Sequence, residues 1–202
     1  MTSGAYLFQA NGTLNSRALT NAVGWSNPIV RMTRNVSNSV VRLHKKGART
    51  ILIPDGDEWQ RCPGLPPLND TQVVQIKEQI RTYNRSLENT LTALDASIPN
   101  LRLLRPNFHD RWNEFLDQAT SLGFTVVDKD AINDPALTDK SFTGPGKDYV
   151  FWTGAHPTTR VHGVWAEWFG EAATQSRTES LRLVTRGGSF DLELTKLKLG
   201  RK

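Results

Sequence analysis

Cysteine is almost absent from this sequence, because Cys62 is the only one among 202 residues. A single cysteine excludes a disulfide within the chain. It also argues against a cysteine–histidine zinc site, since no histidine stands at a ligand spacing from Cys62. The six-residue offset between His156 and His162 does not place two rings on one face of a helix. We therefore expect no metal site.

Long hydrophobic runs are absent as well. No stretch of about 18 apolar residues occurs, so we predict no transmembrane helix. The first four residues are not a basic segment followed by an apolar one, so we predict no signal peptide in this chain. The net charge is +5, but basic residues are spread along the chain except at 45–49 and 196–202. Because nucleic-acid-binding proteins usually gather basic residues on one face, we expect no nucleic-acid partner.

Helical and strand patterns alternate through the chain, which is long enough for one domain with a sizeable core. Apolar residues recur at helical spacing in 29–46, 70–98 and 107–122. Short apolar runs predict buried strands at 5–8, 50–53 and 101–104, and another apolar run occupies 149–152. A helix followed by a buried strand is typical of a parallel sheet. We predict an α/β fold, with loops at 13–28 and 54–69 and a polar, turn-rich segment at 128–148.

Two places in the sequence have both a functional and a structural interpretation. The 54–69 loop follows the end of a strand, where ligands bind in open α/β sheets, and Trp59 and Cys62 are candidates to line a pocket there. The alternative is a surface loop with one buried aromatic residue. His109 and Asp110 are neighbours in sequence, but adjacent residues on a helix do not face each other, so we do not predict a catalytic pair.

The residues from Lys147 to Phe169 carry the most information. The apolar run 149–152 leads into a turn, Thr153-Gly154-Ala155, and His156 follows. Pro157 suits the first turn of a helix, where the missing N–H costs nothing. We predict that His156 lies at the junction of a loop and a helix. Such a place suits a catalytic base on a rigid scaffold, although an exposed or helix-capping histidine is the simpler interpretation.

The same residues resemble the last conserved block of the GDSL-type (SGNH) hydrolases, F-W-D-x-x-H-P-T, which carries a catalytic aspartate and histidine. The matching residues are Phe151, Trp152, His156, Pro157 and Thr158, while Thr153 stands where the family has its aspartate. Residues 43–67 are similar to the family's G-A-R segment with its strand and proline-rich loop. Asn11, in Gln9-Ala10-Asn11-Gly12, is the one residue that matches the family's G-x-N-D block.

The resemblance implies a three-layer α/β/α fold of the flavodoxin-like, SGNH-hydrolase kind with a mostly parallel sheet, here without its first strands. The hydrolase-like domain would span 1–175. Two alternating runs, 180–184 and 190–194, flank Gly187-Gly188 and predict a β-hairpin, so residues 176–202 would form an appended hairpin and tail.

The resemblance also implies hydrolysis of a carboxylic ester through an acyl-serine, without cofactor or metal. His156 would be the general base, Asn11 an oxyanion donor, and Thr153 a neutral substitute at the acid position. The family's Gly-Asp-Ser nucleophile block does not occur in this chain. Ser3 lies at the extreme terminus and is a poor candidate. Asp148 could replace the acid on grounds of proximity alone.

Three interpretations follow. The chain is the C-terminal part of a GDSL-type lipase or esterase, or it is a catalytically inactive relative that binds a ligand or a partner. The third is a structural module that assembles through its hairpin. The substrate of an active form would be a small-molecule ester such as a lipid or an acetylated sugar. The residues leave the substrate, the oligomeric state and the localisation open, although family members are often secreted.

Overall fold

The structure, a computed structural model, describes residues 22–141 and 143–186. The α-helices are α3 (Ala22–Lys45), α4 (Asp70–Ser97), α5 (Phe108–Gln118) and α6 (Thr159–Arg186). The strands are β1 (Thr50–Leu52), β2 (Arg102–Leu104), β3 (Val126–Asp130), β4 (Tyr149–Thr153) and β5 (His156–Pro157). Two short 3-10 helices are η1 (Trp59–Arg61) and η2 (Pro145–Asp148). The strand predicted at 5–8 and the candidate residue Asn11 lie outside the described residues.

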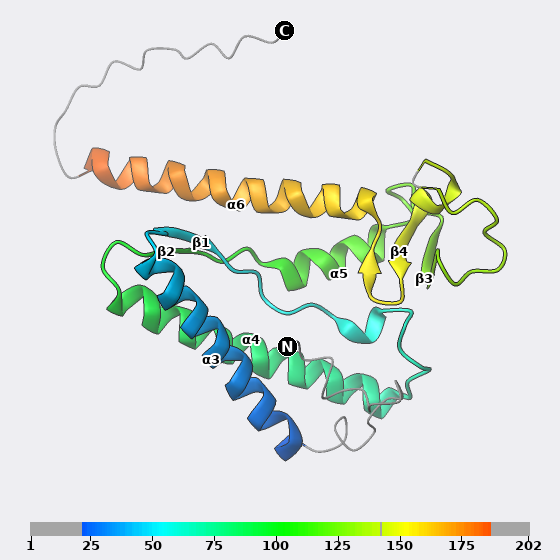
Figure 1. Cartoon of the computed structure of the whole chain (residues 1–202), viewed down its shortest axis with the longest axis horizontal. Coiled ribbons are helices and arrows are strands. Elements are labelled where there is room, and N and C mark those ends of the chain that lie inside the picture. Colours follow the sequence, from blue (N-terminus) through cyan, green and yellow to red (C-terminus); the bar gives the residue numbers. More distant parts are fainter. Residues whose placement is uncertain (1–21, 142, 187–202) are drawn as a thin grey trace, which may run out of the picture.

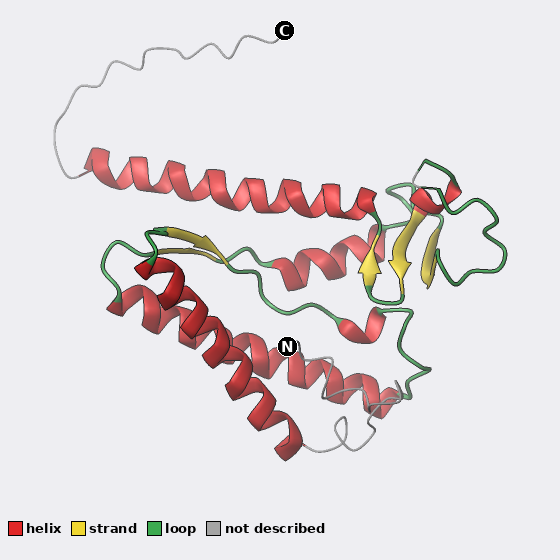
Figure 2. Cartoon of the chain, in the orientation of Figure 1, coloured by secondary structure: helices red, strands yellow, loops and turns green. Residues whose placement is uncertain are grey.

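The strands of the described part form two small sheets. β1 and β2 pair in parallel, with Thr50 opposite Arg102 and Leu52 opposite Leu104. β4 is the middle strand of the other sheet, parallel to β3 and antiparallel to β5. Helices α3 and α4 lie on one side of the molecule and α6 on the other, with β1, β2 and α5 between them (Figure 1). The predicted α/β class is confirmed, with small mixed sheets among long helices (Figure 2).

Helix α4 begins and ends where its sequence indicates. The Asn69 side chain accepts a hydrogen bond from the Gln72 N–H, and the Gln72 side chain accepts one from the Asn69 N–H, which completes a capping box. The helix therefore begins at Asp70, the first residue of the predicted helical pattern, with Asn69 as its cap. The buried residues of α4 recur every three or four positions and are Ile76, Ile80, Leu87, Leu91 and Leu94. Of these, Leu87, Leu91 and Leu94 form one cluster with Val40 of α3 and with Leu101 and Leu103 at β2.

A second core cluster is aromatic and joins α5, β4 and α6. Like Phe151, Trp112 is only 1% exposed. Its ring meets Phe151 of β4 and Trp165 of α6 edge to face, with centroids 6.0 and 5.2 Å apart. Each such pair contributes roughly 0.5–1.5 kcal/mol beyond the area that it buries. The cluster therefore fixes β4 relative to α6, and the turn that carries His156 lies between these two elements.

Two element boundaries differ from the sequence prediction. Helix α3 begins at Ala22, inside the stretch predicted as a loop, and continues through Pro28. The buried side chains of Ile29, Thr33 and Val40 show that tertiary packing outweighs the hydrogen bond lost at Pro28. β3 was not predicted, because its middle residues, Asp128 and Lys129, are exposed and hide the strand pattern.

The predicted C-terminal hairpin is wrong in its first strand. Residues 180–184 lie within α6, which continues to Arg186. Leu181 and Val184 are three residues apart, so this short run fits a helix as well as a strand. The second strand, 190–194, lies outside the described residues, and the domain division at residue 175 stays a prediction. Among the described helices, none combines the length and the apolar character that a membrane span needs.

Leu91→Ala is expected to lower the free energy of unfolding by about 2–5 kcal/mol, because it opens a cavity at a residue that is 2% exposed. Val74→Ala, on the exposed face of the same helix, is the matched control and should change stability by less than about 0.5 kcal/mol. Urea unfolding of the two variants tests this. Equal losses would contradict the assignment of the α4 faces.

Candidate active site

The candidate base, His156, lies on a tight turn between β4 and β5. Thr153 ends β4 and pairs with His156 across the antiparallel ladder, with Gly154 and Ala155 between them. The His156 side chain is exposed and that of Thr153 is half-buried. The sequence placed His156 at a loop–helix junction with Pro157 in the first helical turn. The structure instead places both residues in β5, and α6 begins at Thr159.

Buried hydrogen bonds of Thr158 fix the chain directly after His156. The Thr158 hydroxyl donates to the carbonyl of Tyr149 at 2.9 Å, and its N–H donates to the carbonyl of Val150 at 3.0 Å. The carbonyl of Thr158 in turn accepts from the N–H of His162 at 3.0 Å. The side chain is 3% exposed, so these bonds are shielded from water. The backbone around His156 is therefore attached to the start of β4 and to the first turn of α6.

The turn also touches the loop that follows β1. The Gly64 N–H donates to the Gly154 carbonyl at 2.8 Å. A Cβ added to Gly154 would lie 2.5 Å from the Gly64 Cα, and one added to Gly64 would lie 2.7 Å from the Gly154 Cα. Both are shorter than real Cβ contacts, so the two backbones meet only because both residues are glycine. The contact brings the carboxyl-end loop of one small sheet to the candidate base on the other.

Asp148 does not replace the missing acid in this structure. It precedes β4, about 16 Å along the extended strand from Thr153. One carboxylate oxygen accepts from Arg160 at 3.3 Å and the other from Lys147 at 2.9 Å. Its charge is thus used to anchor the start of α6. Thr153 remains the residue at the position of the family's aspartate, and Asn11 and Ser3 lie outside the described residues.

Trp59 and Cys62, the residues predicted to line a pocket, separate in the structure. Trp59 contributes to an apolar pocket between α3 and α4. Cys62 instead packs against the aromatic core cluster. Burial, together with the charge of Asp57, raises the pKa of the Cys62 thiol to about 12. At neutral pH this thiol carries almost no charge, so it is not a nucleophile.

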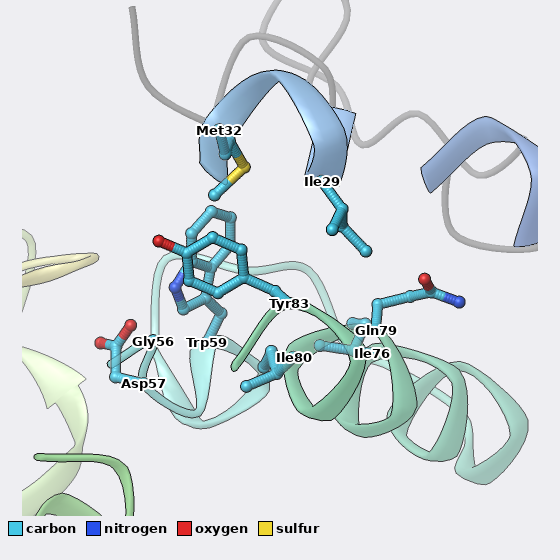
Figure 3. A pocket seen from close by; sticks show the side chains of 9 residues that line it. All are labelled: Ile29, Met32, Gly56, Asp57, Trp59, Ile76, Gln79, Ile80 and Tyr83. Carbon is cyan, nitrogen blue, oxygen red and sulfur yellow. The ribbon is translucent and has the colours of Figure 1, made fainter. Parts of the chain in front are cut away.

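The pocket beside Trp59 is a small cavity of about 40 Å³. Ile29 and Met32 of α3 face Tyr83 and Ile80 of α4, with Trp59 beside them (Figure 3). The remaining lining residues are Gly56, Asp57, Ile76 and Gln79. A cavity of roughly 150 Å³ is needed to hold benzene, so this one admits a methyl-sized group and not an acyl chain. We therefore do not assign it to a substrate.

A cluster of charged groups that the sequence did not predict lies beside this pocket. His109 Nδ1 is 2.8 Å from Asp110 Oδ1, although the two residues are neighbours on a helix. The prediction that they do not face each other is wrong here, because both lie in the first turn of α5. His109 Nε2 is also 3.3 Å from Glu58 Oε1. The signal in the sequence was Asp55-Gly56-Asp57-Glu58, which places three carboxylates directly after β1.

The electrostatics of this cluster follow from burial. Desolvation raises the pKa of Asp55, against hydrogen bonds from the backbone of His109 and Phe108. Desolvation also raises the pKa of Asp57. Hydrogen bonds from Asn107 and then His109 lower the pKa of Asp110, which is largely exposed. Within 22–141 and 143–186, no group of histidine, cysteine and acidic side chains has the geometry to hold a metal ion.

The fold and the turn define an α/β protein with an exposed histidine just after the carboxyl end of β4. Its sequence is similar to parts of known proteins. No family model matches the chain. GDSL esterase/lipase EXL2 from Arabidopsis thaliana is 27% identical over 149 residues, or 67% of this chain and 39% of the relative. GDSL esterase/lipase At1g71250 from the same organism is 25% identical over 142 residues, or 64% of this chain and 38% of the relative.

These matches confirm the resemblance to the GDSL-type esterase/lipase family over part of the chain. The relationship is therefore to ester hydrolases, at the level of the family. The chain spans less than two fifths of the length of the curated relatives that it matches.

Gly154→Ala is expected to destabilise the protein by about 1–3 kcal/mol, because the new methyl group meets the Gly64 backbone. Gly163→Ala is the matched control. Its methyl group would meet nothing within 4 Å, and alanine in place of glycine within α6 should add up to about 1 kcal/mol of stability. Urea unfolding measures both changes. A neutral Gly154→Ala would show that the two backbones do not meet in solution.

Proposed function

We propose that this chain forms the base-bearing part of a GDSL-type ester hydrolase. The observation that carries the proposal is the turn at the carboxyl end of β4, which presents an exposed His156 opposite Thr153. The names and the partial identity of the two Arabidopsis relatives support the same class of reaction. The arrangement of helices and strands is compatible with a three-layer SGNH-hydrolase fold, which we propose for the complete domain.

In this proposal His156 takes the proton of a serine hydroxyl as that serine attacks the ester carbonyl. The serine bond to the acyl carbon forms while the alcohol leaves with a proton returned by His156. Water then releases the acid by the same route in reverse. Asn11 is proposed as an oxyanion donor. The serine comes from a Gly-Asp-Ser block that this chain does not contain.

Thr153 favours a second candidate function, an inactive relative that binds an ester-like ligand or a protein partner. A threonine hydroxyl accepts a hydrogen bond from an imidazole but supplies no negative charge to stabilise the imidazolium. In serine proteases the neutralised acid costs about 10⁴-fold in turnover. With Asp148 paired to Arg160 and Lys147, no carboxylate near the turn in sequence compensates for that loss. The substrate proposed for an active form remains a small ester, such as a lipid or an acetylated sugar.

The base is tested in the chain joined to the Gly-Asp-Ser segment of a GDSL-type relative. His156→Ala is expected to reduce hydrolysis of p-nitrophenyl butyrate by about 10²-fold or more, because no other group would take the serine proton, while binding and the oxyanion donors leave a residual rate. His162→Ala, which removes an exposed ring from α6, is the matched control and should leave the rate unchanged. An unchanged rate in His156→Ala, or an equal fall in both variants, would end the assignment.

Thr153→Asp tests the acid position in the same joined chain. Since a carboxylate opposite His156 would stabilise the imidazolium, kcat is expected to rise by about 10²–10⁴-fold. Thr153→Asn introduces a side chain of the same size as aspartate but without its charge, so it should give no such gain in kcat. If Thr153→Asp also gives none, the turn does not aim this side chain at His156, and the binding function takes the lead.

A further inference from the structure

The 54–64 loop, from Pro54 to Gly64, connects parts of the molecule that are far apart in sequence. Its Gly56 exchanges two hydrogen bonds with the Asn84 side chain of α4, at 2.7 and 3.0 Å. Its Arg61 reaches α5, where it binds Asp117 at 2.7 Å. Gly64 ends the loop against Gly154. A shift of this loop would therefore move both the wall of the apolar pocket and the turn that carries His156.

His109 contacts the loop through both its backbone and its ring. Its backbone N–H donates to Asp55 Oδ1 at 2.8 Å. Its ring nitrogens lie between two carboxylates, with Nε2 3.3 Å from Glu58 Oε1 and Nδ1 2.8 Å from Asp110 Oδ1. The ring joins the loop to the first turn of α5. The side chains of His109 and Glu58 are 18% and 10% exposed, so water competes little for this contact.

The contacts of the His109 ring with Glu58 and Asp110 depend on how many N–H groups the ring carries. A neutral imidazole carries one N–H, so it can donate to one carboxylate while its other nitrogen presents a lone pair. A carboxylate facing that lone pair is repelled. The imidazolium form carries an N–H on both nitrogens, so it suits a ring that lies between two carboxylates. A neutral ring would leave one of the two contacts without a donor.

The other charged groups around His109 are mostly acidic. Asp55, Asp57 and Glu58 face it from the loop, and Asp110 faces it from its own helix. A cation on this side, Lys77 of α4, lies 3.9 Å from the second oxygen of Glu58. Burial raises the pKa of Asp55 and of Asp57, so these groups also favour the folded loop at lower pH.

We propose that His109 is a protonation-dependent latch that fastens the 54–64 loop to α5 and releases its Glu58 side when the imidazole becomes neutral. The latch closes the pocket wall formed by Gly56, Asp57 and Trp59. Through Gly64 it also steadies the turn that carries His156. The latch goes beyond the proposed hydrolase function and does not depend on it, because it concerns the loop alone.

Hydrogen exchange of the unaltered chain tests the latch. Protection factors of the Gly56 and Cys62 amides, corrected for the intrinsic pH dependence of exchange, are measured by NMR from about pH 5.5 to about pH 8.5, a range that spans imidazole titration. The contact contributes while His109 is protonated and is lost as the pH rises. Protection is therefore expected to fall by about fivefold, the upper end of what one partly exposed ion pair contributes.

Four variants isolate the contribution of the His109 ring. In His109→Gln the protection should be independent of pH within about twofold, because glutamine does not titrate. In Glu58→Gln it should also be flat, since the amide N–H can donate to the neutral imidazole. Asp57→Asn removes a nearby carboxyl group and should keep the fall in amide protection as the pH rises. Arg61→Ala loosens the loop at every pH and should also keep this pH-dependent step.

Two results would overturn the latch. The first is a flat profile for the unaltered chain. The second is a pH step that survives both His109→Gln and Glu58→Gln. Neither result bears on ester hydrolysis, which depends on His156, so failure of the latch is distinguishable from failure of the proposed function.

Discussion

The hydrogen bond between the Gly64 N–H and the Gly154 carbonyl is the constraint on which the candidate site depends. The molecule has an aliphatic cluster around α3, α4, β1 and β2, and an aromatic cluster around α5, β4 and α6. The 54–64 loop leaves the first cluster and reaches the second at this bond. Because neither backbone tolerates a Cβ, the loop and the turn that carries His156 fix each other's positions.

The chemistry of the turn is that of a base without its acid. His156 is exposed and held by strand pairing and by the buried bonds of Thr158, so its backbone is rigid while its ring is accessible. Thr153 occupies the place of an aspartate and cannot supply the charge that stabilises an imidazolium. The carboxylate nearest in sequence is already used by Arg160 and Lys147. This explains why the family resemblance and the local electrostatics favour different answers on activity.

Local patterns predicted the parts of the fold that are decided locally. The stripe of α4 and the apolar runs of β1, β2 and β4 all appear as the sequence indicates. Gly47, which follows α3, has a φ of 102°, as a left-handed cap requires. The start of α3 and the polar strand β3 were missed because packing, not propensity, decides them. A run such as 180–184 fits two periodicities, and only the continuous helix α6 resolves it.

The candidate site was predicted in part. The histidine and the substituted acid position follow from a contiguous block of sequence, so their proximity was foreseeable. The contacts of Gly64 with Gly154 and of Glu58 with His109 join residues 90 and 51 positions apart (154 − 64 and 109 − 58), and no local pattern encodes them. The His109–Asp110 pair was rejected on a rule for helix interiors. It forms because the first turn of a helix leaves side chains more freedom.

The most direct test of this account is the exchange rate of the Gly64 amide in the unaltered chain. If the 54–64 loop holds the turn that carries His156, this amide is bonded to the Gly154 carbonyl and should exchange at least about 100-fold more slowly than a free peptide amide. Exchange at the rate of a free peptide would contradict the account, because the loop and the turn would then move independently and nothing would tie the candidate base to the rest of the site.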